Sequence, residues 1–120
     1  MRVLIVESKK ELGQLWKRHL ERADCDVTLA QDQETATEIL MEQEFSVIIL
    51  DLVLEGGSAL ALADHASFRQ PDAQVVFVTN TSFFSDGTLF QHIPNLRAVV
   101  QRETCPSDLT EMVRFYAGAN

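Results

Sequence analysis

An unbroken apolar run, Val47 to Leu50, leads directly to an acidic residue, Asp51, and then to a Gly-Gly turn. A half-exposed strand would alternate polar and apolar residues, so this run predicts a strand, Phe45 to Leu50, that is buried on both faces. Strands of that kind occur in parallel sheets covered by helices, and ligands bind at the carboxyl edge of such sheets. We therefore expect Asp51 to be a functional carboxylate at the end of a buried strand.

Four further short apolar runs predict the remaining strands of the sheet. They are Arg2 to Val6, Val27 to Ala30, Val75 to Val78 and Leu96 to Val100. Apolar residues at helical spacing predict helices between and after the strands, with the inward residues Leu12, Leu15, Trp16, His19, Leu20 and Ala23 in the first, Ala36, Ile39 and Leu40 in the second, Ala59, Leu62, Ala63 and Ala66 in the third, and Leu109, Met112, Val113 and Tyr116 in the last. A further short helix is expected within Thr81 to Pro94, where several phenylalanines call for burial.

Polar residues mark where these helices should begin. Ser8 and Glu11 have the spacing of a capping box, in which each side chain satisfies a free amide at the helix start. Asp32 and Ser58 are predicted N-caps of the second and third helices, and Pro106 suits the first turn of the last one.

Five strands that alternate with five helices predict a parallel sheet covered on both faces. The simplest arrangement is α/β: a flavodoxin-like, doubly wound five-stranded sheet with the order 2-1-3-4-5. That order brings the ends of strands one, three, four and five around one crevice. The side chains at those ends are Glu7, Ser8, Asp51, Thr79, Gln101 and Arg102.

Composition limits the class of protein. Hydrophobic residues make up 46% of the chain and charged residues 23%, which is typical of a soluble globular domain, and we expect one domain over residues 1–120 without an output domain. No apolar stretch is long enough to span a membrane and no signal peptide is evident, so a cytoplasmic location is expected.

The net charge of −8 argues against direct nucleic-acid binding. Cys25 and Cys105 should lie at opposite edges of the sheet as free thiols.

The residues at the predicted crevice resemble those of a response-regulator receiver domain, and the likeness covers the whole chain. That family has an acidic pair after strand one, a phosphoacceptor Asp after strand three, Thr or Ser after strand four and Lys-Pro after strand five. Asp51 in DLVLEGGSAL matches the phosphoacceptor motif, and Thr79 in VVFVTN matches the hydroxyl position. Leu109 has the expected offset from the position of the Lys.

The chain also departs from the family pattern. Glu7 and Ser8 stand where the family has two acids, Arg102 replaces the Lys, and Glu103 replaces the Pro. Two further positions differ: Asn80, where a small residue is usual, and Val99, where an aromatic residue is common.

The resemblance implies a role for each matching residue. Asp51 would accept a phosphoryl group from a histidine kinase or a phosphotransfer protein, and Thr79 would donate its hydroxyl to a phosphoryl oxygen. Arg102 would contact the phosphoryl group or form a salt bridge with Asp51. A Mg²⁺ ion would be held by Glu7, Asp51 and Val53, with weak or lost affinity because Ser8 supplies no third carboxylate.

Two other functions are possible from the residues alone. One is a pseudo-receiver that takes no phosphate and serves as an interaction or dimerisation module, held in one state by an Arg102–Asp51 pair. Either kind of receiver could form a homodimer through the face made by the fourth helix, strand five and the fifth helix. The second alternative is a flavodoxin-like enzyme. It is disfavoured because the sequence has no phosphate-binding Gly-rich loop and no pair of nucleophile and base. We therefore expect that the protein is not an enzyme.

Overall fold

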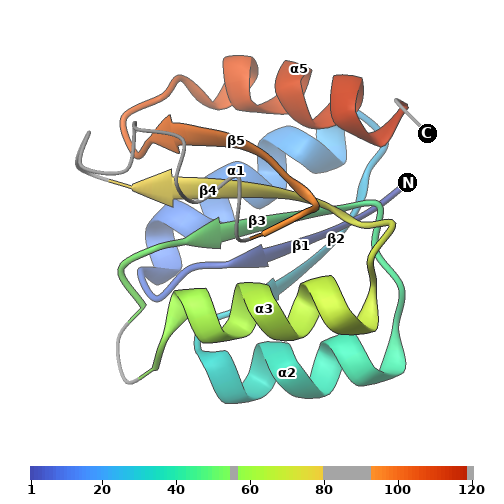
Figure 1. Ribbon diagram of the computed structural model, residues 1–120. Coiled ribbons are helices and arrows are strands. Elements are labelled where there is room, and N and C mark those ends of the chain that lie inside the picture. The colour runs from blue at the N-terminus through green and yellow to red at the C-terminus, as the bar shows by residue number, and fades with distance from the viewer. Residues whose placement is uncertain (55–56, 80–92, 119–120) are drawn as a thin grey trace.

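A computed structural model of the chain describes residues 1–54, 57–79 and 93–118. Its centre is one parallel sheet of five strands in the order β2-β1-β3-β4-β5, which confirms the predicted fold class and strand order (Figure 1). The strands are β1 (Arg2–Val6), β2 (Asp26–Ala30), β3 (Val47–Asp51), β4 (Gln74–Thr79) and β5 (Leu96–Gln101). The carboxyl ends of all five strands therefore lie along one edge of the sheet.

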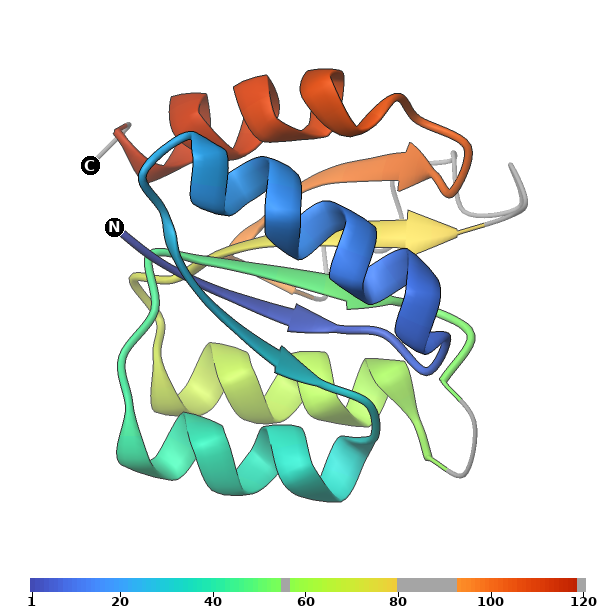
Figure 2. The same ribbon diagram turned by 180° about the vertical axis from the view of Figure 1, so that it is seen from behind.

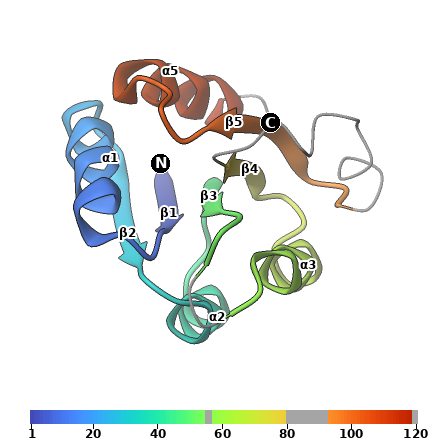
Figure 3. The same cartoon turned by 90° about the vertical axis from the view of Figure 1, so that its left-hand side faces the viewer.

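Helices cover both faces of the sheet. α1 (Lys10–Arg22) and α5 (Pro106–Ala117) lie side by side on one face (Figure 2), and α2 (Gln33–Glu42) and α3 (Ala59–Arg69) lie on the other (Figure 3). Four of the five predicted helices are thus present in the described part of the chain. The helix expected within Thr81 to Pro94 falls almost entirely on residues 80–92, outside the described ranges.

The apolar runs of the strands form two separate cores, because successive side chains of a strand point to opposite faces. In β3, Ile48 and Leu50 pack into the core under α2 and α3, whereas Val47 and Ile49 pack into the core under α1 and α5. All five residues of β3 are buried, as the unbroken apolar run predicted. Trp16 of α1 is also buried, in the second core.

Three of the four predicted helix starts are confirmed. The Asp32 carboxylate accepts a hydrogen bond from the Thr35 amide at 2.7 Å, and the Ser58 hydroxyl accepts one from the Ala61 amide at 3.2 Å. Pro106 is the first residue of α5.

The structure places the N-cap of the first helix one residue later than the capping box predicted for Ser8 and Glu11. α1 begins at Lys10, and its N-cap is Lys9, whose side chain makes no capping hydrogen bond. Pairing with β2 continues one residue past the end of β1, where the Glu7 N–H donates to the Ala30 carbonyl at 3.0 Å. The chain is therefore still extended at Lys9, one residue beyond Ser8.

The connection between β3 and α3 is tied to the start of α2. The Gln33 side-chain oxygen accepts a hydrogen bond from the Ser58 amide at 2.8 Å. A Cβ atom at Gly57 would lie only 2.7 Å from that oxygen and 2.8 Å from the Gln33 Cβ, so a side chain at position 57 would displace Gln33. This contact positions the loop that follows Asp51.

Two global predictions can be compared with the structure. Cys25 and Cys105 are both free, as expected; Cys25 is buried and Cys105 is exposed. In the described ranges, each helix is too short or too polar to cross a lipid bilayer.

Candidate functional site

The strand order brings together three predicted site residues at the carboxyl edge. Asp51 is the last residue of β3 and Thr79 the last of β4, and both are buried. Thr79 is paired with Gln101 of β5, and its carbonyl accepts a hydrogen bond at 2.7 Å from the Arg102 amide. Arg102 therefore leaves the sheet one strand away from Thr79 and two strands away from Asp51.

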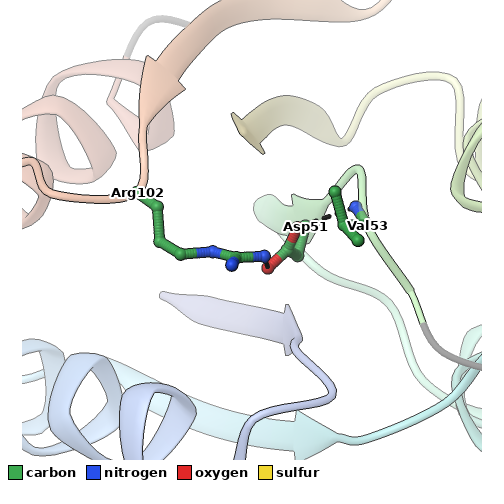
Figure 4. A network of polar contacts seen from close by, with 3 residues as sticks. All are labelled: Asp51, Val53 and Arg102. Carbon is green, nitrogen blue, oxygen red and sulfur yellow. Dashed lines mark hydrogen bonds and ion pairs between the residues drawn. The ribbon is translucent and has the colours of Figure 1, made fainter. Parts of the chain in front are cut away.

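The Asp51 carboxylate has two partners (Figure 4). Its Oδ2 atom forms an ion pair with Arg102 Nη2 at 2.5 Å, and its Oδ1 atom accepts a hydrogen bond from the Val53 amide at 2.8 Å. The Asp51 side chain is 0% exposed and that of Arg102 only 17% exposed. A buried carboxylate is stable only when its charge is neutralised and its oxygens are bonded, and these two contacts meet both needs.

Arg102 can make this contact because its side chain is long and its charge is spread over a planar fork. It extends from the end of β5 to the end of β3, as Figure 4 shows. The Arg102 Nε atom is buried and has no hydrogen-bond partner among the described residues. The guanidinium thus retains a buried donor that a further oxygen atom could use.

Glu7 lies beside Asp51 but differs from it in protonation state. It follows β1, whose last residue, Val6, is paired with Leu50 of β3. Its side chain is fully buried, and neither carboxyl oxygen has a hydrogen-bond partner of normal geometry in the described ranges. Burial, reinforced by the neighbouring Asp51 carboxylate, raises the pKa of Glu7 to about 8. Glu7 is therefore mainly protonated at neutral pH.

Val53 takes part through its backbone. Sequence reasoning placed it among the Mg²⁺ ligands; the structure places its N–H on Asp51 Oδ1, while its side chain is 52% exposed. No sequence signal could have identified this donor, because every residue except proline has a backbone N–H.

These residues do not fit a divalent cation while the Asp51–Arg102 pair is closed. Mg²⁺ prefers several oxygen ligands in near-octahedral geometry, usually including one or two carboxylates. Here one Asp51 oxygen is already paired with the Arg102 guanidinium, and the other accepts a hydrogen bond from the Val53 amide. In the described part of the chain, no cluster of three His, Cys, Asp or Glu residues could hold a metal. The ligand roles of Glu7, Asp51 and Val53 stay a prediction.

Known proteins share this sequence pattern. The response regulator receiver domain family matches residues 3–101, from β1 to the end of β5. The chain is 30% identical over 78 residues to the response regulator receiver protein CpdR of Brucella abortus, covering 65% of each chain. It is 29% identical over 87 residues to the uncharacterized transcriptional regulatory protein YrkP of Bacillus subtilis, covering 72% of this chain and 37% of YrkP. It thus spans about two thirds or less of these relatives.

Solved structures share the fold at lower identity. A CheY-like receiver domain from Methanospirillum hungatei has a TM-score of 0.88 and 19% identity, covering 97% of this chain and 92% of that one. A Burkholderia pseudomallei response regulator with a phosphorylated aspartic acid, a calcium ion and citrate has a TM-score of 0.85 and 19% identity, covering 97% and 68%. TrrA of Thermotoga maritima, in complex with Mg(2+)-BeF, has a TM-score of 0.83 and 21% identity, covering 96% and 97%.

The family match and the geometry agree on the same edge of the sheet. The matched residues include Glu7, Asp51 and Thr79, and Arg102 directly follows the matched region. Since the match extends over most of the sequence and all five strands, this chain belongs to the response regulator receiver domain family.

Proposed function

We propose that this chain is a signalling receiver that accepts a phosphoryl group on Asp51 from a phosphohistidine of a histidine kinase or phosphotransfer protein. The observation that carries the proposal is the position of Asp51: a charge-paired carboxylate at the carboxyl edge of the sheet, between Glu7 and Thr79. The Burkholderia pseudomallei structure with a phosphorylated aspartic acid has the same fold, which supports phosphorylation at this kind of site.

The reaction is a nucleophilic displacement at phosphorus. An Asp51 oxygen forms a bond to the phosphorus atom as the bond from the donor histidine nitrogen to phosphorus breaks. The departing nitrogen keeps the electron pair of that bond and is protonated by solvent. The product is an acyl phosphate on Asp51 and a neutral histidine on the donor.

Arg102 supplies the positive charge that this displacement needs. Its guanidinium is already at Asp51, so it can move from the carboxylate to the phosphoryl oxygens with little displacement. The Val53 amide holds the carboxylate in a fixed orientation through Oδ1, and Thr79 places a hydroxyl at the neighbouring strand end. The guanidinium, the amide and the hydroxyl all belong to this chain.

Phosphorylation would replace the single negative charge of the Asp51 carboxylate, now balanced by one guanidinium, with a phosphoryl charge of about −1.5 to −2. Arg102 follows β5, and its amide is bonded to Thr79, so its movement would be transmitted to β5 and α5. We place the output surface there, including a homodimer face with the exposed Phe115 of α5. We further propose a cytoplasmic receiver that makes no direct contact with nucleic acid, in keeping with a net charge of −8.

One observation favours a second function. The Asp51 carboxylate is fully buried and both of its oxygens are engaged, so the resting pocket is already neutralised. A domain held in this one state would bind its partner without phosphorylation. It would then act as a constitutive interaction module.

The test is acid-labile, hydroxylamine-sensitive phosphate on Asp51 after incubation with a small phosphodonor, with and without Mg²⁺. The wild-type protein should be labelled, Asp51→Asn should not, and the matched control Asp32→Asn, at an exposed carboxylate, should be labelled like wild type. Partner binding is measured on the same proteins. Binding that is equal in wild type and Asp51→Asn, with and without donor, would overturn the receiver in favour of the constitutive module.

A further inference from the structure

The cation beside Asp51 belongs to the protein. Arg102 Nη2 and Asp51 Oδ2 are 2.5 Å apart, and the side chains are 17% and 0% exposed. We infer that the Arg102 guanidinium takes the place of a divalent cation in this pocket, so that the pocket is closed to Mg²⁺ while the pair is intact.

Both oxygens of the Asp51 carboxylate already have a partner. A metal ion would need an Asp51 oxygen at about 2.0–2.1 Å, with other oxygen ligands arranged around it. Oδ2 forms an ion pair with the Arg102 guanidinium, and Oδ1 accepts a hydrogen bond from the Val53 amide. Each oxygen keeps a second acceptor site, but a dication on either one would lie beside the Arg102 guanidinium, which repels it.

The charges of the pocket also oppose the binding of a dication. Asp51 and Arg102 neutralise each other, and Ser8 is neutral where a second carboxylate would attract a dication. A dication placed here would be repelled by the guanidinium and would also lose part of its hydration shell. The attraction between this pocket and Mg²⁺ is therefore too weak to offset the free energy of removing water from the ion.

The inference deepens the proposed function, since it concerns the same Asp51 pocket, but it does not depend on phosphorylation. Metal binding can be measured with no phosphodonor present. A failure of the metal result and a failure of Asp51 labelling are thus separate observations.

The experiment is calorimetric titration of Mg²⁺ into wild type, Arg102→Ala and Arg97→Ala. Arg97 is an exposed residue of β5 whose guanidinium bonds only to the Pro94 and Leu96 carbonyls in the described ranges, so its loss changes the net charge equally without touching Asp51. Arg102→Ala should bind Mg²⁺ about tenfold or more tightly than the other two proteins, because Asp51 Oδ2 is freed. Wild-type affinity equal to or tighter than that of Arg102→Ala would overturn the inference.

A second readout covers the case in which Arg102→Ala does not fold. Paramagnetic Mn²⁺ broadens amide signals near its binding site, and the Val53 amide is bonded to Asp51. In the wild-type protein, Mn²⁺ at millimolar concentration should leave the Val53 signal no broader than that of Asp51→Asn. Selective broadening of Val53 in wild type, absent from Asp51→Asn, would show a metal on Asp51 with Arg102 present and would contradict the inference.

Discussion

Asp51 and Glu7 are two carboxyl groups at the ends of adjacent strands, and both are fully buried. Asp51 has a guanidinium on one oxygen and a backbone amide on the other, whereas neither oxygen of Glu7 has a normal hydrogen bond in the described ranges. Burial disfavours charge at both positions, but only Asp51 has partners that offset this cost. Strand position therefore decides which acids are buried, and a partner from a distant segment decides which of them carries a charge.

The largest expected effect is a pH dependence of the free energy of unfolding, which comes from Glu7. Its pKa is raised to about 8 in the folded protein from an ordinary value of 4.5, so the native state holds a proton that the unfolded chain has released between these values. Its stabilising contribution is full below pH 4.5 and is lost as pH rises through about 8, falling by about 1.4 kcal/mol per pH unit. Glu7→Gln should remove this dependence and be more stable than wild type near pH 8, by on the order of 4 kcal/mol.

Urea unfolding at several pH values compares the two proteins directly. The stabilities of wild type and Glu7→Gln should converge near pH 5 and diverge as the pH rises. A carbon NMR titration of the Glu7 carboxyl group gives its pKa independently. Parallel stability curves for the two proteins would show that Glu7 does not hold a proton in the folded state.

The second prediction concerns the cation that distinguishes Asp51 from Glu7. Arg102→Ala leaves the Asp51 carboxylate buried without its cation, which should lower the free energy of unfolding by about 3 kcal/mol. Arg102→Lys should lose less, because an ammonium keeps the charge but not the planar fork. The exposed control Arg97→Ala should lose little. Equal losses for Arg102→Ala and Arg97→Ala in urea unfolding would mean that the Asp51 ion pair contributes nothing.

Asp51→Asn should cost less than Arg102→Ala, about 1 kcal/mol, because the two partners are buried to different extents. Arg102 is 17% exposed and can turn its charge toward water, whereas Asp51 is 0% exposed. The same change removes the carboxylate that helps to raise the pKa of Glu7, so that pKa should fall while burial still holds it above 4.5. An unchanged Glu7 titration in Asp51→Asn would show that the two groups do not interact.

The smallest effect is expected at an exposed carboxylate, Asp32. At the start of α2 the Asp32 carboxylate accepts a hydrogen bond from the Thr35 N–H, and this bond lowers the pKa of Asp32. Its contribution is therefore present above the ordinary value of 3.8 and is lost as pH falls through the lowered pKa, the opposite direction to Glu7. Asp32→Ala should give a small loss at neutral pH that shrinks on acidification. A loss that grows on acidification would exclude the capping bond as its cause.

Much of the site could be predicted because it follows from strand order. Apolar runs identified the strands, and parallel strands place Asp51, Thr79 and Arg102 at one edge. The phenylalanines expected to be buried, Phe83, Phe84 and Phe90, lie outside the described residues, whereas the nearby Ile93 is described and is buried.

Local patterns were less reliable where longer-range bonding competed with them. The Ser8–Glu11 spacing suits a capping box in isolation, but strand pairing through Glu7 delays the start of α1. Sequence reasoning also missed the contact of Gln33 with the loop at Gly57 and Ser58, which joins segments far apart in the chain. Side-chain amides carry no periodic signal that would point to such a partner.

The amino-acid sequence by itself determined the strands, the burial of β3 and the acid at its end, because these depend on short-range apolar patterns. Only the tertiary structure decided that Arg102 neutralises Asp51 across 51 positions of sequence and that Glu7 holds its proton. An apolar run needs only its own residues to indicate a buried strand, whereas the charge of an acid depends on its distance to groups that only folding brings together.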